Sequence, residues 1–93
     1  ERLAELTAAW RSAAERGVAP DSAEAQALAR RHADWLAGIP GTPKAPSGGP
    51  AREYLLNLGD MYVADPRFAA NYGGEEGARF VRDALRVLVE RAG

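Results

Sequence analysis

The chain has 93 residues, of which 46% are hydrophobic and 27% are charged, a composition typical of one small globular domain. Twelve Lys and Arg against thirteen Asp and Glu leave a net charge of −1, which excludes the cationic surplus of a nucleic-acid-binding surface. The chain has no cysteine and one histidine, so disulfides and the usual zinc sites are excluded. No apolar run reaches the length of about 18 residues that a membrane span needs. We therefore expect a cytoplasmic domain that needs no metal or cofactor and contacts no membrane.

The first segment of the chain is rich in Ala, Leu, Glu and Arg, which are strong helix formers. Gly17 and Pro20 then interrupt the pattern and indicate a turn. The sequence predicts a helix over residues 1–16. Its apolar stripe consists of Leu3, Leu6, Trp10 and Ala13.

A second helical pattern follows this turn. Asp21 precedes it, and Glu24 follows three residues later, as in a capping box. We predict that Asp21 caps a helix over 22–38, and that this helix pairs antiparallel with the first because the turn between them is short. Its apolar stripe consists of Ala25, Leu28, His32, Trp35 and Ile39.

Residues 40–50 hold four prolines and three glycines, which excludes a helix or a central strand. We predict a mobile loop within a single domain over 1–93, because neither flank is long enough to bury a core alone. After the loop, Gly59 lies inside a helical pattern, where glycine needs a reason such as close approach of another helix. Asp65 and Pro66 predict the cap and first turn of a short helix. The predicted helices in this half are 51–64, 66–71 and 75–91.

No segment shows the period-two alternation of a strand. The sequence therefore predicts an all-α fold of four main helices and one short helix. Within it, Trp10 and Phe80 are assigned to the core, and Asp60 to a solvated helix face or to an ion pair with an arginine.

Residues 58–71, which read Leu-Gly-Asp-Met-Tyr-Val-Ala-Asp-Pro-Arg-Phe-Ala-Ala-Asn, resemble the characteristic motif of the TipAS family of antibiotic-recognition domains. His32-Ala33-Asp34-Trp35-Leu36 is similar to the His-x-x-Trp-Leu stretch of its members, and residues 80–85 fit their closing helix. The resemblance covers residues 20–92. It implies a globin-like, all-helical fold with a ligand cleft between helices.

Members of this family bind thiopeptides, albicidin or other bulky and mainly apolar antibiotics. Some are effector domains of MerR-type transcription regulators, and others sequester the drug. The family prototype captures thiopeptides covalently through a cysteine just before the Leu-Gly of the motif, where this chain has Asn57. The resemblance therefore implies reversible, non-covalent binding. A MerR-type DNA-binding domain would lie upstream of Glu1, in a parent protein that forms a homodimer, and this domain would not contact DNA itself.

We expect the ligand in a cleft between the second, third and short helices, with the Pro/Gly-rich loop closing over it. His32 lies on an apolar stripe, so it is either a core histidine or a polar contact in the pocket. Asn71 is either a helix cap or a ligand contact. The predicted ligand-binding residues are His32, Trp35, Tyr54, Asn57, Met61, Tyr62, Phe68, Asn71 and Tyr72.

Two other functions remain alternatives. Four amphipathic stripes also suit a helical dimerisation or structural module without a small ligand. A small enzyme would need His32 as an acid or base, but none of the common catalytic motifs is present, and we expect no enzyme activity.

Overall fold

The computed structural model describes residues 3–92, and its secondary structure is helical. Within these residues no β-strand forms, although Lys44 and Pro50 make an isolated antiparallel bridge. The predicted all-α, globin-like fold is thereby confirmed. Its elements are α1 (Leu3–Glu15), α2 (Ala23–Ala37), α3 (Arg52–Ala64), α4 (Pro66–Ala69), the 3₁₀ helix η1 (Ala70–Tyr72) and α5 (Glu75–Ala92).

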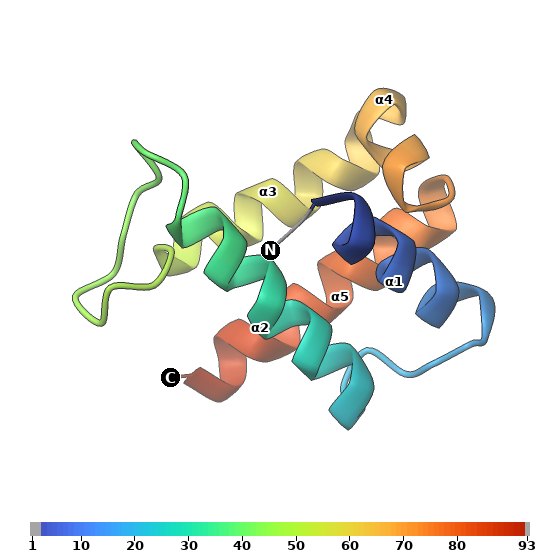
Figure 1. Ribbon diagram of the computed structural model, residues 1–93, viewed down its shortest axis with the longest axis horizontal. Coiled ribbons are helices and arrows are strands. Elements are labelled where there is room, and N and C mark those ends of the chain that lie inside the picture. Colours follow the sequence, from blue (N-terminus) through green and yellow to red (C-terminus); the bar gives the residue numbers. More distant parts are fainter. Residues whose placement is uncertain (1–2, 93) are drawn as a thin grey trace.

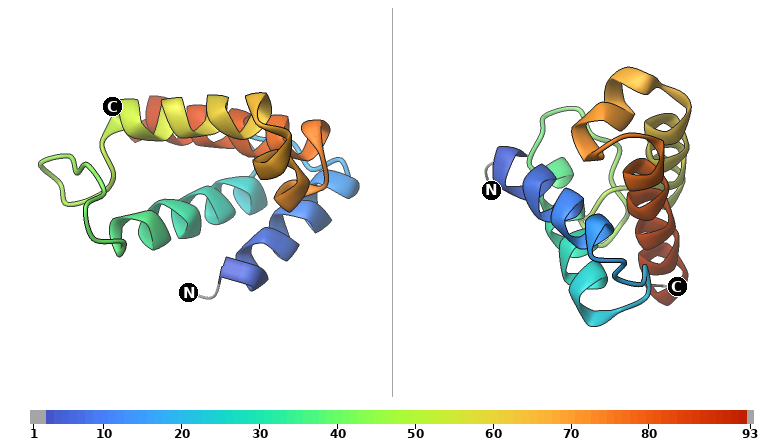
Figure 2. Two further views of the ribbon diagram at one scale, coloured as in Figure 1. Left: turned by 90° about the horizontal axis from the view of Figure 1, so that it is seen from above. Right: turned by 90° about the vertical axis from the view of Figure 1, so that its right-hand side faces the viewer.

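Helix α5 is the centre of the fold, because it contacts every other helical element. Helices α3 and α5 lie side by side and run in opposite directions (Figures 1 and 2). Helices α1 and α2 also run in opposite directions, as the short turn between them predicts. The segment formed by α4 and η1 lies at one end of the α3–α5 pair, and the Pro/Gly-rich loop lies at the other end (Figure 1).

Gly59 provides the close approach between α3 and α5 that its helical position predicts. A Cβ atom added at Gly59 would lie 3.2 Å from the Cα atom of Arg82 on α5. Nearby, Asp60 of α3 pairs with Arg86 of α5, and the two charged atoms are 2.9 Å apart. The assignment of Asp60 to an arginine partner is therefore confirmed.

The core lies around α5, and α1, α2, α3 and the segment formed by α4 and η1 all contribute buried residues to it. Trp10 is fully buried and its ring meets that of Phe80 edge to face, with 5.7 Å between the ring centroids. Both residues belong to the core, as predicted.

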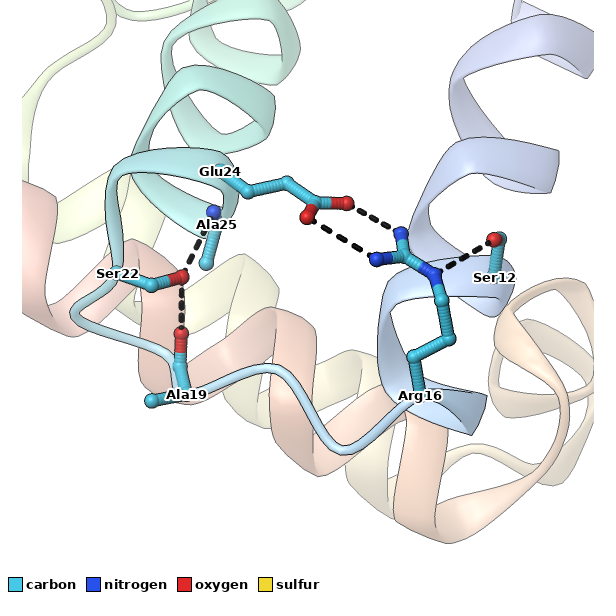
Figure 3. A network of polar contacts seen from close by, with 6 residues as sticks. All are labelled: Ser12, Arg16, Ala19, Ser22, Glu24 and Ala25. Atoms are coloured by element: carbon cyan, nitrogen blue, oxygen red, sulfur yellow. Dashed lines mark hydrogen bonds and ion pairs between the residues drawn. The ribbon is translucent and has the colours of Figure 1, made fainter.

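The turn between α1 and α2 differs from the prediction in its cap. Ser22, not Asp21, is the N-cap of α2: its hydroxyl accepts a hydrogen bond from the amide of Ala25, 3.1 Å away (Figure 3). Glu24 makes a bidentate ion pair with Arg16 at the end of α1 (Figure 3). The predicted capping box was wrong, because the glutamate has a better partner across the turn.

The Pro/Gly-rich loop forms a hydrogen-bonded turn. The amide of Ala45 donates to the carbonyl of Gly49 over 2.8 Å, and the amide of Ala51 donates to the carbonyl of Pro43 over 2.9 Å. The Thr42 hydroxyl anchors the loop to α2 by donating to the carbonyl of Leu36 over 2.8 Å. The mobility of this loop stays a prediction.

Candidate ligand-binding groove

An aromatic groove opens between the N-terminal half of α1, the C-terminal ends of α2 and α3, and the segment formed by α4 and η1. Its volume is about 280 Å³. None of its lining residues carries a charge, and four of them are aromatic. The lining consists of Leu3, Ala4, Thr7, Trp35, Tyr62, Phe68, Asn71 and Tyr72.

Asp65 and Pro66 place the ring of Phe68 at the groove. The Asp65 carboxylate caps α4 by accepting from the amide of Arg67 over 3.0 Å, and Pro66 occupies the first turn. The chain therefore turns sharply after α3, and Phe68 stacks on Tyr62, with 6.0 Å between centroids and 28° between ring planes. Phe68 remains 40% exposed, so it is available to a ligand.

Tyr72 is held at the groove by two glycines. Gly73 ends η1 with a φ of +90°, a conformation that favours glycine. Gly77, in the first turn of α5, packs against the carbonyl of Tyr72 so closely that a Cβ atom there would lie 1.6 Å from its oxygen. This contact fixes the Tyr72 ring 5.0 Å from the Tyr62 ring, centroid to centroid.

A buried polar chain lies beneath the groove. The indole Nε1–H of Trp10 donates to Nδ1 of His32 over 3.2 Å, and Nε2 of His32 lies 3.0 Å from the hydroxyl oxygen of Tyr62. His32 is fully buried. The chain thus links the core to a residue that lines the groove.

Burial keeps these groups neutral. Desolvation lowers the pKa of His32 to about 4, because the interior disfavours the imidazolium. Burial likewise raises the pKa of Tyr62 and of Tyr72 above the ordinary tyrosine value. At neutral pH the groove and the polar chain below it therefore carry no charge, which suits an apolar or aromatic ligand.

The sequence model of a protein family, the TipAS antibiotic-recognition domain, matches residues 1–88 of the chain. The chain belongs to the TipAS family. No curated protein and no solved structure matches it significantly. The match confirms the family that residues 58–71 indicate, and with it a domain whose general role is the recognition of antibiotics.

The fold of this TipAS domain brings five of the predicted site residues together at the groove. They are Trp35, Tyr62, Phe68, Asn71 and Tyr72. His32 lies beneath them, without access to the surface. Tyr54 and Met61 are partly buried against the core, Asn57 is exposed on α3, and none of these three lines the groove.

The sequence analysis missed the contribution of α1. Leu3, Ala4 and Thr7 form one wall of the groove. Leu3 belongs to the apolar stripe of its helix, and it is 43% exposed. The signal that could have found this wall is that the apolar stripe begins at Leu3, one turn before the buried Leu6. A large apolar side chain at the end of a helix, beyond the core, indicates an exposed apolar surface.

A second groove, of about 460 Å³, lies at the other end of the molecule. The Pro/Gly-rich loop forms one of its walls, and the ends of α2, α3 and α5 form the others. No predicted site residue lines it. The loop does not line the aromatic groove, and its closing over a ligand stays a prediction.

In the part of this TipAS domain that the structure describes, no cluster of three or more histidine, aspartate or glutamate side chains could hold a metal ion. Among residues 3–92, no helix has the length and apolar character to cross a membrane.

Proposed function

We propose that this TipAS domain binds a bulky, mainly apolar aromatic antibiotic reversibly in the aromatic groove. The observation that carries the proposal is the juxtaposition of Trp35, Tyr62 and Phe68, which offers flat ring faces in an uncharged setting. Flat rings of this kind bind planar ligands through large apolar contacts at low entropic cost.

The groove's volume decides how much of the ligand it holds. Pockets that enclose a drug-sized molecule span about 300–1,000 Å³. The aromatic groove, at about 280 Å³, therefore takes one planar portion of a thiopeptide-like or albicidin-like compound. The remainder of the molecule would lie on the neighbouring surface, where Leu3 is exposed.

Reversible binding follows from the side chains that the chain offers. It contains no cysteine, and Asn57 stands where the covalent family prototype has its reactive thiol. An amide is not a nucleophile toward a dehydroalanine, so binding would be non-covalent. Both ring nitrogens of His32 are already hydrogen-bonded within the protein, which favours binding over acid–base catalysis.

In the cell, the domain would act as the effector domain of a MerR-type regulator, or as a protein that sequesters the drug. The first role needs a DNA-binding domain upstream of Glu1 and a homodimeric parent. The balanced charge of the chain supports the view that this domain would not contact DNA itself.

The test is a titration followed by intrinsic tryptophan fluorescence. The panel holds a thiopeptide, albicidin and one unrelated apolar dye, and Trp35→Phe identifies the reporting residue. We expect one antibiotic to change the fluorescence saturably, with the response lost in Trp35→Phe. If no antibiotic changes the emission of the folded domain, the proposal fails.

A matched pair of variants locates the site. Phe68→Ala removes a large exposed ring from the groove, and Ile39→Ala removes an equally exposed apolar side chain outside it; the two are 40% and 39% exposed. We expect Phe68→Ala to weaken binding by about tenfold, the loss typical of an aromatic contact residue. Ile39→Ala should change it by less than about twofold.

The second candidate function is a helical interaction module. The exposed side chains of Leu3, Ile39 and Phe68 favour it, because large apolar groups on a surface often mark an interface. Light scattering over a range of concentrations separates the two functions. A mass that doubles with concentration and returns to the monomer in Phe68→Ala, together with no drug response, supports the interaction module.

A further inference from the structure

The second groove differs from the aromatic groove in size and in lining. Its volume of about 460 Å³ falls within the range of about 300–1,000 Å³ in which pockets enclose a small molecule. Among the described residues that line it, none is aromatic, and the largest apolar side chains are those of Leu55, Leu88 and Val89. The groove therefore favours a flexible aliphatic chain over a stack of planar rings.

The apolar part of this groove is held in place by the core and by the Pro/Gly-rich loop. Leu55 of α3 and Val89 of α5 belong to the core, and each is 5% exposed. Ala45 and Pro50 contribute the wall on the side of the loop. The hydrogen bond from the Ala45 amide to the Gly49 carbonyl closes this wall into a turn. An aliphatic chain in the groove would thus lie between the packed ends of two helices and a hydrogen-bonded loop.

The charged side chains of the groove carry a positive excess. Arg30 of α2 and Arg52, the first residue of α3, line it together with one acid, Asp34. All three side chains are exposed, and among residues 3–92 neither arginine pairs with a carboxylate. Elsewhere in the fold, Arg67 and Arg86 each pair with an aspartate. The two guanidinium groups at the second groove are therefore open to an anion from outside the chain.

The chemistry of the guanidinium group narrows the class of anion. Its paired N–H donors match the two oxygens of a carboxylate, and the contact is a charge-assisted hydrogen bond. Two arginines against Asp34 leave one positive charge, which matches a head group with one negative charge. Glu53 follows Arg52 in sequence but does not line the groove.

We propose that the second groove binds an aliphatic carboxylate, a molecule with an apolar chain and one anionic head group. The chain lies against Leu55, Leu88 and Val89, and the head group pairs with Arg30 and Arg52. This site is separate from the aromatic groove, so the inference goes beyond the proposed function and does not depend on it. The domain would then bind two ligands of different chemistry, one at each end of the fold.

The experiment uses three probes that share an eight-carbon chain and differ in the charge of the head group: octanoate, 1-octanol and octylammonium. Binding of each probe to the isotopically labelled domain is followed by NMR at neutral pH, where octanoate is ionised. We expect octanoate to shift the methyl resonances of Leu55, Leu88 and Val89 saturably. It should bind about fivefold more tightly than 1-octanol, the upper range for an exposed ion pair. Octylammonium should bind most weakly of the three.

Four variants locate the head group. Arg30→Gln and Arg52→Gln should each weaken octanoate binding about threefold and leave 1-octanol binding within about twofold of the wild type. Asp34→Asn should tighten octanoate binding, because it removes the negative charge of the lining. Arg11→Gln is the matched control, because Arg11 is an exposed arginine of α1 that does not line this groove. It makes the same change in net charge and should leave octanoate binding unchanged.

Three results would overturn the inference. The first is equal binding of octanoate and 1-octanol, or tighter binding of octylammonium, which would show that the arginines do not select the head group. The second is a set of octanoate shifts confined to the aromatic groove. The third is a change in the resonances of the second groove when the free domain is diluted, since a second copy of the chain would then cover it. The antibiotic titration is independent of all three, so the proposed function stands or fails separately.

Discussion

The indole nitrogen of Trp10 donates a hydrogen bond to His32, and this contact joins α1 to α2 across 22 residues of sequence, in a fully buried position. It ties the core to the aromatic groove, because the same imidazole meets the hydroxyl of Tyr62 on its other side. A histidine with both ring nitrogens engaged in this way holds α1, α2 and α3 in one arrangement.

The burial of His32 predicts an acid-sensitive fold. Its pKa falls from the ordinary value of 6.5 to about 4 in the folded protein. Between these values the unfolded chain binds a proton at His32 and the folded chain does not, so the free energy of unfolding decreases as the pH falls. We expect a loss of about 2 kcal/mol between about pH 7 and about pH 5.

Urea denaturation at a series of pH values measures this loss. His32→Gln is the control: it should be less stable at neutral pH, because it breaks the buried contacts, but its stability should vary less with pH in this window. An equal pH dependence in the two proteins would show that other groups are responsible.

Gly77→Ala tests the packing that holds Tyr72. The added Cβ would lie 1.6 Å from the Tyr72 carbonyl oxygen, so α5 and η1 must separate. We expect a loss of more than about 2 kcal/mol in the free energy of unfolding. Gly38→Ala is the matched control, because its Cβ would meet its nearest neighbour at 3.5 Å. It should change stability by less than about 0.5 kcal/mol. A mild Gly77→Ala phenotype would mean that the segment around Tyr72 is loosely held.

The cap of α2 is tested by Ser22→Ala against Asp21→Ala. The Ser22 hydroxyl accepts from the Ala25 amide, so its removal should cost about 1 kcal/mol of stability. Asp21 does not cap the helix, and its replacement should cost less than about 0.5 kcal/mol. Chemical denaturation gives both values, and the reverse order would restore the capping role that the sequence indicates for Asp21.

The N-cap of α4 affects both the stability of the fold and the position of Phe68 at the groove. Asp65→Ala removes the acceptor of the Arg67 amide and should cost about 1 kcal/mol. Asp65→Asn keeps an acceptor and should cost less. Because this cap directs Phe68 to the groove, Asp65→Ala should also weaken ligand binding more than Asp65→Asn does. Equal affinities of the two variants would show that this cap does not influence ligand binding at the groove.

Local signals explain which parts of the fold were predictable. Asp65 and Pro66 were placed correctly, because a cap and a proline in the first turn act within a few residues of each other. Asp21 and Ser22 are adjacent in sequence, and both are good N-cap residues. The ion pair between Arg16 and Glu24 decides between them, because it withdraws Glu24 from the capping box with Asp21. That contact depends on how α1 and α2 meet.

The residues of the candidate site were also predictable only where the signal is local in sequence. The motif at 58–71 holds Tyr62 and Phe68, Tyr72 follows it directly, and the fold keeps the three rings together at the groove. Tyr54 and Met61 lie on the same helix as Tyr62, but the face of α3 that meets the groove is decided by how α3 packs against α5 and α4. The partners of His32 lie 22 and 30 residues away, which no local pattern indicates.

The most direct test of the central claim is an NMR map of the labelled domain with the antibiotic that changes its fluorescence. The account predicts that the largest shift changes fall on Trp35, Phe68, Asn71 and Tyr72, around the aromatic groove. Changes confined to Ala45, Ser47 and Leu88 would place the ligand in the second groove and contradict the account.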